Sequence, residues 1–240
     1  MISDWCRVRT LVFSLGLLAA AVGQAQTVVV PKELPNLGKL QAEVGKLQAE
    51  LKDYHDCRGI HGCYATDLDR EAATATAALD RIARAWRPGT KLALVLDIDE
   101  TSLSNYSEMA QADFAYNAAV WDRWVETAGA PAIPGTLRLY REAERLGVAV
   151  FFITGRPETQ RAATEKNLRS QGYTQWAGLA MRNAAQAQAP TAAFKSGERG
   201  KIVAAGYRIA VNVGDQMSDL NGSPGAEVSV KLADPFYYIP

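Results

Sequence analysis

The chain has 240 residues and is 48% hydrophobic, enough to bury one sizeable core with appendages. Its 26 Lys and Arg residues balance 26 Asp and Glu residues. The composition therefore shows neither the basic surplus of a protein that binds nucleic acid polymers nor an acidic tail.

Residues 1–25 have the pattern of a secretory signal peptide. Arg7 and Arg9 precede an apolar run at 11–23, and the small residue Ala25 follows it. Because the run is too short to span a bilayer comfortably, we expect cleavage after Ala25 and export to the periplasm or the medium. The mature chain would then have no membrane span. An uncleaved membrane anchor is the alternative.

Residues 26–63 predict an N-terminal extension. The stretch 26–36 contains three Val and two Pro and predicts an extended lead-in, whereas 38–51 repeats a seven-residue unit, GKLQAEV and then GKLQAEL. The apolar residues of the repeat alternate at spacings of four and three, as in the seam of a coiled coil: Leu40, Val44, Leu47 and Leu51. Two repeats are short for a coiled coil, so we expect a helix packed on its own domain. A homodimer through this helix is the alternative.

Two cysteines, Cys57 and Cys63, remain once Cys6 leaves with the signal peptide. In an oxidising compartment an even pair is most simply a disulfide, and two glycines in the loop CRGIHGC permit the sharp turn that closes it. Metal binding by the two cysteines with His61 is the alternative, but three ligands without a fourth make a poor zinc site. We therefore expect the disulfide.

Residues 64–240 predict one α/β domain. A helix at 64–86 ends at RPGT (87–90), and from there strands and helices alternate. We expect strands at 91–97, 148–153, 177–182, 208–213 and 227–232. We expect further helices at 134–147, 156–172 and 196–206, the last with Ser196 as its N-cap. This alternation indicates a Rossmann-like parallel sheet with helices on both faces.

The segment at about 101–133 is long for a connection between a strand and its helix. It is also rich in aromatic residues, including Trp121 and Trp124, whose spacing places them on one helical face. Both features predict a small helical cap inserted after the first core strand. Its aromatic side chains either stack on a substrate ring or pack the cap onto the core.

Acidic residues follow two of the predicted strands. Asp97 and Asp99 end the strand 91–97, and Asp215 and Asp219 follow the strand 208–213. Because the carboxyl ends of parallel strands meet at one edge, where ligands bind, we expect these carboxylates to lie close together. Crowded carboxylates repel one another, and Mg²⁺, a hard cation that prefers oxygen ligands, would relieve the repulsion. We give the neighbouring Glu100 a helix-capping role and no catalytic one.

Three further residues at this edge suit phosphoryl transfer. Thr154 and Gly155 follow the strand 148–153, where a hydroxyl and backbone N–H groups can hold phosphoryl oxygens. Lys195 precedes the expected start of the helix 196–206, so it lies at the same edge and can offset developing charge. Lys201 is the alternative, but it would lie about 9 Å further down that helix.

The motifs DIDET, FFITGR, a later lysine and GDQMSD resemble, in this order, the four motifs of the phosphatases of the haloacid dehalogenase (HAD) superfamily. The chain looks most like the secreted acid phosphatase branch, which includes class B and class C acid phosphatases and plant vegetative storage proteins. The ending DPFYYIP also resembles these sequences. The resemblance covers roughly residues 60–240 and supports an HAD-like domain over 64–240.

The resemblance implies a role for each acid at the edge. Asp97 would be the nucleophile that becomes an aspartyl-phosphate. Asp99 would protonate the leaving group and then activate water. Asp97, the backbone carbonyl of Asp99 and Asp215 would hold Mg²⁺, while Asp219 would bind the waters of the metal or orient one of its ligands.

The resemblance also implies the partners of the phosphoryl group and the activity. Thr154, Gly155 and Lys195 would bind the group as it is transferred. The chain would be an exported, Mg²⁺-dependent acid phosphatase acting on small phosphomonoesters. The alternatives are a non-catalytic storage or binding protein on the same scaffold and a phosphotransferase. The sequence contains no P-loop, no G-x-S-x-G elbow and no H-E-x-x-H motif.

Overall fold

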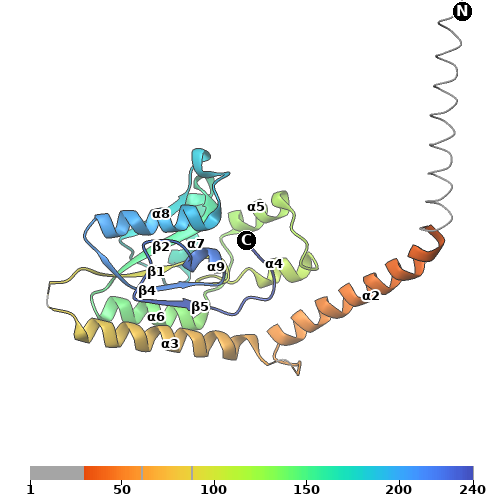
Figure 1. Cartoon of the computed structure of the whole chain (residues 1–240), viewed down its shortest axis with the longest axis horizontal. Helices are drawn as coiled ribbons and strands as arrows, with labels where there is room; N and C mark the ends of the chain where they lie inside the picture. The colour runs from red at the N-terminus through yellow and green to blue at the C-terminus, as the bar shows by residue number, and fades with distance from the viewer. Residues whose placement is uncertain (1–29, 61, 88, 240) are drawn as a thin grey trace, which may run out of the picture. The chain divides into compact units, whose positions relative to one another are not determined.

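The structure is a computed structural model that describes residues 30–60, 62–87 and 89–239 (Figure 1). The predicted signal peptide lies outside these residues. The chain divides into two compact units, Met1–Glu50 and Leu51–Pro240. Within the described residues, every helix is too short or too polar to cross a membrane.

The described part of the first unit belongs to helix α2 (Val30–His55). The extended lead-in expected over 26–36 is therefore wrong from Val30 onward. Pro31 lies in the first turn, where a backbone N–H has no intrahelical acceptor and proline is tolerated. Within this unit the seam residues Leu40, Val44 and Leu47 are 61%, 54% and 55% exposed.

The second unit is built on the five-stranded parallel sheet that the sequence predicts. Its strand order is β3-β2-β1-β4-β5. The strands are β1 (Leu92–Leu96), β2 (Ala149–Pro157), β3 (Gly178–Arg182), β4 (Arg208–Gly214) and β5 (Val228–Lys231). All five residues of β1 are buried, as expected of an apolar strand covered on both faces.

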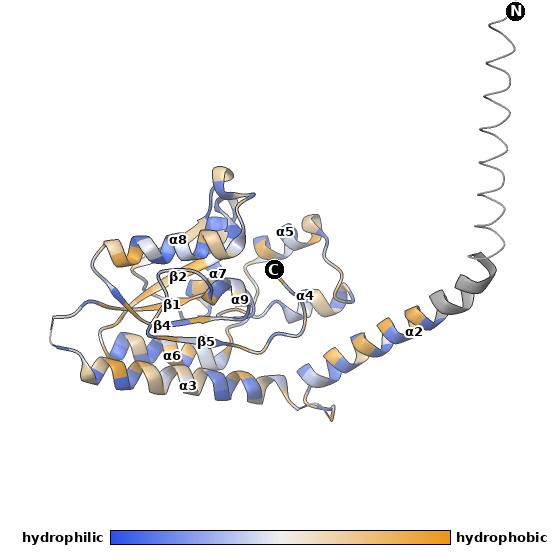
Figure 2. Cartoon of the chain, in the orientation of Figure 1, coloured by the Kyte–Doolittle hydropathy of each residue, from blue (hydrophilic) through white to orange (hydrophobic). Residues whose placement is uncertain are grey.

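Helices cover both faces of this sheet (Figure 1). Alternate residues of β1 point to opposite faces, so Leu94 joins the larger core and Val95 the smaller one. The larger core also contains residues of α3 (Tyr64–Ala85), α6 (Pro134–Arg145) and α7 (Arg161–Ser170), while α8 (Thr191–Ala204) supplies Phe194 and Ile202 to the smaller one. Figure 2 shows apolar strands between helices that are apolar on one side.

The segment after β1 contains two short helices, α4 (Tyr106–Gln111) and α5 (Ala118–Thr127). The side chain of Asn117 accepts from the backbone N–H of Val120 and caps α5. Figure 1 shows both helices beyond the carboxyl-terminal ends of the strands, on the side where the chain ends. These two helices are hereafter called the cap.

Two predicted helix starts are wrong. The helix after β2 does not begin at residue 156, because β2 extends to Pro157; a 3-10 turn (Glu158–Gln160) precedes α7. Proline disfavours helical backbone in the residue before it, which keeps Arg156 extended. Helix α8 begins at Thr191 with Pro190 as N-cap, so Ser196 lies within the helix and does not cap it.

Candidate active site

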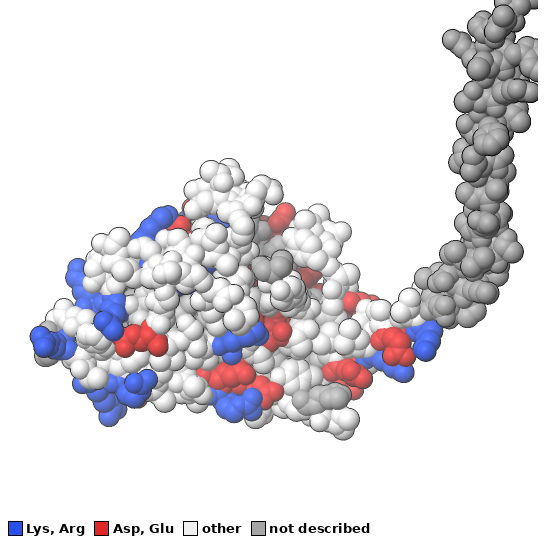
Figure 3. Space-filling model, in the orientation of Figure 1, with Lys and Arg blue, Asp and Glu red and all other residues white. Residues whose placement is uncertain are grey.

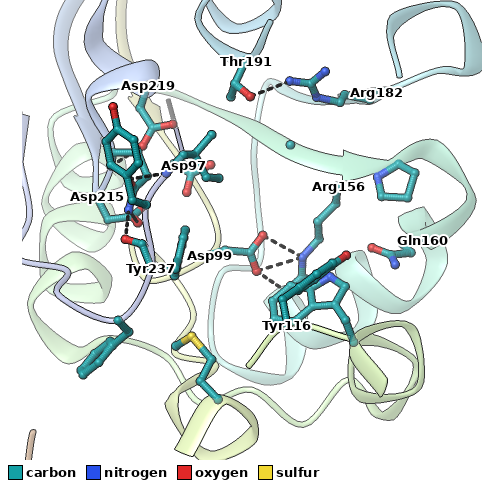
Figure 4. A pocket seen from close by; sticks show the side chains of 18 of the residues that line it. Asp97, Asp99, Tyr116, Arg156, Gln160, Arg182, Thr191, Asp215, Asp219 and Tyr237 are labelled. Atoms are coloured by element: carbon teal, nitrogen blue, oxygen red, sulfur yellow. Dashed lines mark hydrogen bonds and ion pairs between the residues drawn. The ribbon is translucent and has the colours of Figure 1, made fainter. Parts of the chain in front are cut away.

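Three buried carboxylates meet where the strand order reverses, between β1 and β4. Asp97 follows β1, Asp215 follows β4, and Asp219 lies in the short helix α9 (Met217–Leu220). One carboxylate oxygen from each lies within 4.8 Å of the others. Figure 4 shows the three side chains on one side of the cavity. Ligands of open parallel sheets bind at such a reversal.

The charges of these carboxylates are costly to bury. Burial raises the pKa of Asp97 well above its usual range, against the opposing charge of Lys195, and it raises the pKa of Asp215 to about 8. A divalent cation would favour the ionised forms, and an all-oxygen donor set suits a hard cation. The carboxylate cluster therefore fits a divalent metal ion.

Lys195 reaches the carboxylate cluster from α8. Its Nζ forms ion pairs with both Asp97 and Asp219, and the side chain is buried. Burial lowers the pKa of Lys195, but the two carboxylates outweigh that effect and raise it. Lys195 lies inside α8, not before its start as the sequence suggested. Lys201 pairs with Glu198 at the surface.

Asp99 lies apart from the carboxylate cluster and points toward Arg156 (Figure 4). The Nε of Arg156 lies 3.1 Å from both carboxylate oxygens of Asp99, and its Nη2 lies 2.6 Å from Oδ1. The hydroxyl of Thr154 is buried, accepts from the backbone N–H of Arg156 at 3.2 Å and lies 3.5 Å from Asp99. Gly155 lines the cavity beside them.

Asn105 connects Asp99 to the cap. Its Nδ2 donates to Asp99 and to Glu100, each at 2.9 Å, and its Oδ1 accepts from the indole N–H of Trp124 at 2.8 Å. Trp121 instead lines the cavity, with the guanidinium carbon of Arg156 5.9 Å from its ring centroid. One of these tryptophans thus supports the site, and the other faces the space that a substrate would fill.

Glu100 shapes the loop that presents Asp99. It is fully buried, and its φ of 51° lies in the left-handed region. Its Oε1 accepts from the backbone N–H of Asn105 at 2.7 Å. Burial raises its pKa to about 8. Glu100 therefore holds the loop between β1 and the cap, a structural task beyond the simple helix cap that the sequence suggested.

Two features allow Asp219 to approach the cluster. A Cβ atom on Gly214 would lie 2.3 Å from the Cβ of Asp219, so only glycine fits at the end of β4. The fully buried Arg199 of α8 donates to the backbone carbonyls of Asp219 and Pro224, the latter at 2.8 Å. Arg199 is a functional residue that the motifs do not indicate, although its spacing of four residues from Lys195 places both on one helical face.

A cavity of about 650 Å³ opens over these groups. Trp121 of the cap and Phe114 and Tyr116 of the loop between its two helices line one side, and the end of the chain lines another through Tyr237 and Tyr238. On the molecular face drawn in Figure 3, several Lys and Arg residues gather at the left end, and elsewhere on the described residues Lys and Arg lie beside Asp and Glu.

Comparison with known proteins gives a family match over residues 17–240, to the model described as HAD superfamily, subfamily IIIB (acid phosphatase). Acid phosphatase 1 of Solanum lycopersicum is 40% identical over 148 residues, which cover 60% of this chain and 58% of that protein. Vegetative storage protein 1 of Arabidopsis thaliana is 32% identical over 152 residues, covering 61% and 55%. The chain thus spans less than two thirds of the length of these relatives.

A solved structure is also similar. The class C acid phosphatase from Bacillus anthracis superposes with a TM-score of 0.64 at 23% sequence identity, covering 81% of this chain and 86% of that one. At this identity the likeness establishes the fold, an α/β sheet flanked by helices.

Proposed function

The chain belongs to the acid phosphatases of HAD superfamily subfamily IIIB, and from that membership we propose that it is an exported, Mg²⁺-dependent hydrolase of small phosphomonoesters. The observation that carries the proposal is the meeting of Asp97, Asp215 and Asp219 with Lys195 at one sheet edge. The phosphatase domain would span 64–240, with its cap at about 101–133.

HAD phosphatases generally use a divalent metal, and Asp97, Asp215 and the backbone carbonyl of Asp99 are the groups that would hold Mg²⁺ here. When bound, the ion would offset the carboxylate charges and attract the phosphate group. Asp219 would orient the site from outside this set, because its Oδ1 pairs with Lys195 and its Oδ2 accepts from the backbone N–H of Gln216 at 2.9 Å.

In the first step, a carboxylate oxygen of Asp97 attacks phosphorus, and the bond between phosphorus and the leaving oxygen breaks. Asp99 donates its proton to that oxygen, so the leaving group departs as an alcohol. Thr154, the backbone of Gly155 and Lys195 bind the phosphoryl oxygens and offset their charge. The product of this step is an aspartyl-phosphate on Asp97.

In the second step, the ionised Asp99 accepts a proton from water as the water oxygen attacks phosphorus. The bond between phosphorus and Asp97 breaks, phosphate leaves, and both carboxyl groups return to their starting states. Asp99 needs one position for both proton transfers. Its hydrogen bonds from Arg156 and Asn105 support that requirement.

Export is supported by the signal-peptide pattern of residues 1–25 and by the disulfide between Cys57 and Cys63 in the structure. We place the mature protein in the periplasm or outside the cell. A homodimer through the exposed seam of α2 remains a prediction, which sedimentation of the full chain with and without Leu47→Lys would test.

The proposal is tested with the purified full chain and p-nitrophenyl phosphate. Asp97→Asn should lower kcat roughly 10³-fold or more while the protein stays folded, whereas the matched surface change Asp69→Asn should leave turnover unchanged. EDTA should abolish activity, and added Mg²⁺ should restore it. Turnover by Asp97→Asn at the wild-type rate would contradict the mechanism.

The two alternatives predict different results in the same assay. A storage or binding protein, as the name of the Arabidopsis relative suggests for that protein, would not turn over substrate; the retained Asp97 favours the enzyme. A phosphotransferase would release less inorganic phosphate than p-nitrophenol when glycerol is added, because part of the phosphoryl group would pass to the alcohol.

A further inference from the structure

The C-terminal segment, residues 234–239, forms one wall of the cavity. It follows β5, and Phe236, Tyr237, Tyr238 and Ile239 all line the cavity. Figure 4 shows Tyr237 beside Asp215. The reaction proposed above gives this segment no task.

One side-chain amide joins the C-terminal segment to the carboxylate cluster. Gln216 is buried, and its Nε2 donates to Oδ2 of Asp215 and to Oδ2 of Asp234, each at 2.8 Å. Its Oε1 accepts from the backbone N–H of Ile239 at 3.1 Å. Carboxylate oxygens accept, so Asp215 and Asp234 require the NH₂ group of Gln216, whereas the backbone N–H of Ile239 requires its carbonyl oxygen. Only one orientation of the Gln216 amide therefore satisfies all three partners.

Three side chains hold Asp215: two donors, Thr101 and Gln216, and the carboxyl group of Asp234, with which it is also hydrogen-bonded. The hydroxyl of Thr101 donates to Oδ1 at 3.1 Å, and Gln216 donates to Oδ2. Thr101 belongs to the loop that follows β1, within the sheet edge itself. Gln216 is instead held by the C-terminal segment. Two of the three side chains that hold Asp215 therefore belong to the C-terminal segment or are held by it.

The C-terminal segment has anchors that do not involve Gln216. The backbone N–H of Ala233, just before it, donates to Oε2 of Glu71 on α3 at 2.6 Å. The ring of Phe236 is buried with its centroid 5.1 Å from that of Tyr106 in the cap. These contacts fix the position of the segment independently of Gln216, so the segment can in turn hold the side chain of Gln216 in place.

We propose that residues 234–239 act through Gln216 as a positioning element for Asp215. The inference rests on the proposed function, because it gives these residues a task at the same site. A cation binds well only when its carboxylate ligands point at it, and groups that orient such ligands change metal affinity about 10- to 100-fold. Gln216 and Asp234 are positioning residues, since neither touches the reacting atoms.

Three variants of the full chain distinguish this positioning role from a general stabilisation of the fold by the C-terminal segment. Gln216→Met keeps the side-chain length and removes both hydrogen-bonding ends. Asp234→Ala removes the acceptor in the C-terminal segment, together with its own hydrogen bond to Asp215, and leaves Gln216 in place. Glu71→Ala is the matched control. It also removes one carboxylate, the one that accepts from the backbone N–H of Ala233, but this carboxylate does not contact Gln216.

Two readouts need no substrate. Calorimetric titration with Mg²⁺ gives the Kd, and amide hydrogen exchange of residues 213–221 reports the order of the loop. We expect the Kd to rise about 10- to 100-fold in Gln216→Met, to rise less in Asp234→Ala, and to stay unchanged in Glu71→Ala. Exchange should become faster in the first two variants only.

Unchanged Mg²⁺ affinity and unchanged exchange in all variants would overturn the proposal. Equal effects of Asp234→Ala and Glu71→Ala would also overturn it, because they would show that the C-terminal segment only stabilises the fold. If Gln216→Met does not fold, the comparison of Asp234→Ala with Glu71→Ala decides. A wild-type chain that binds no Mg²⁺ would count against the proposed function, and the exchange rates alone would then decide this inference.

Discussion

Arg156 binds Asp99 through a two-pronged ion pair: Nε lies 3.1 Å from both carboxylate oxygens, and Nη2 lies 2.6 Å from Oδ1. The side chain of Arg156 is only 2% exposed, and its Nη1 donates to the hydroxyl of Thr164 on α7 at 3.1 Å. A guanidinium fixed at both ends leaves the carboxylate of Asp99 little freedom to turn. This restriction suits the role proposed for Asp99, in which it transfers a proton twice from one place.

Arg156→Lys should therefore weaken the general acid selectively. Lysine keeps the charge but cannot form the planar two-pronged contact. We expect kcat/KM for an alkyl phosphate to fall about 10- to 100-fold, and to fall less for p-nitrophenyl phosphate, whose leaving group needs little protonation. Steady-state kinetics on both substrates measures the difference.

Arg161→Lys is the matched control, because Arg161 pairs with Glu158 and Glu165 at the surface. It should leave both kcat/KM values unchanged. An equal loss on the two substrates by Arg156→Lys would show that Arg156 maintains the site in general and does not act on proton transfer.

The sheet and its acidic edge could be predicted because their signals are local. The run LALVL is apolar throughout, as a strand buried on both faces must be, and Asp97 follows it directly. Parallel topology then brings Asp97 and Asp215 to one edge although they are far apart in sequence. The helix start at Thr191 was missed, although Pro190 offered a local signal for it.

The contacts that orient the acids could not be predicted, because they join segments whose relative placement the sequence does not encode locally. Arg156 follows Thr-Gly and precedes Pro, so it looks like part of a turn, yet it is buried against Asp99. Asn105 meets Trp124 only because the cap folds back. The role of Gln216 depends on where the end of the chain returns.

Trp124→Phe should reduce activity without altering substrate affinity. The change removes the indole N–H that holds Asn105, while an aromatic ring remains to pack the cap. Loss of one hydrogen bond of about 1 kcal/mol predicts a roughly fivefold fall in kcat. Trp176→Phe, a tryptophan that packs on Phe152 away from the cavity, is the control. A rise in KM at unchanged kcat would instead place Trp124 in substrate binding.

Removing the disulfide should lower stability. Cys57 and Cys63 are six positions apart in the sequence, so their bond closes a small loop in the unfolded chain. The chain-entropy relation gives about 2 kcal/mol for a loop of this size, or a fall in Tm of roughly 4–8 °C. Thermal denaturation of the Cys57→Ser/Cys63→Ser double variant measures it. Denaturation of the wild type with a reductant should give the same Tm, and a Tm equal to that of the oxidised protein would contradict the prediction.

Tyr54 and Asp67 should make stability depend on pH. The hydroxyl of Tyr54 donates to Oδ2 of Asp67 at 2.6 Å, and this bond, more than those from Arg70, lowers the pKa of Asp67 against the opposing effect of burial. A carboxyl group whose pKa is lower in the folded state stabilises the fold above its unfolded pKa of about 3.9. That contribution disappears as the pH falls through the folded pKa.

Tyr54→Phe keeps the ring that packs against Tyr64 but removes the donor. We expect it to lower the free energy of unfolding by about 1 kcal/mol near neutral pH, and by progressively less as the pH falls and Asp67 becomes protonated in the folded state. Urea denaturation at several pH values from about 7 down to about 2 measures this trend; a loss that does not shrink toward acid would show that Tyr54 acts through packing alone.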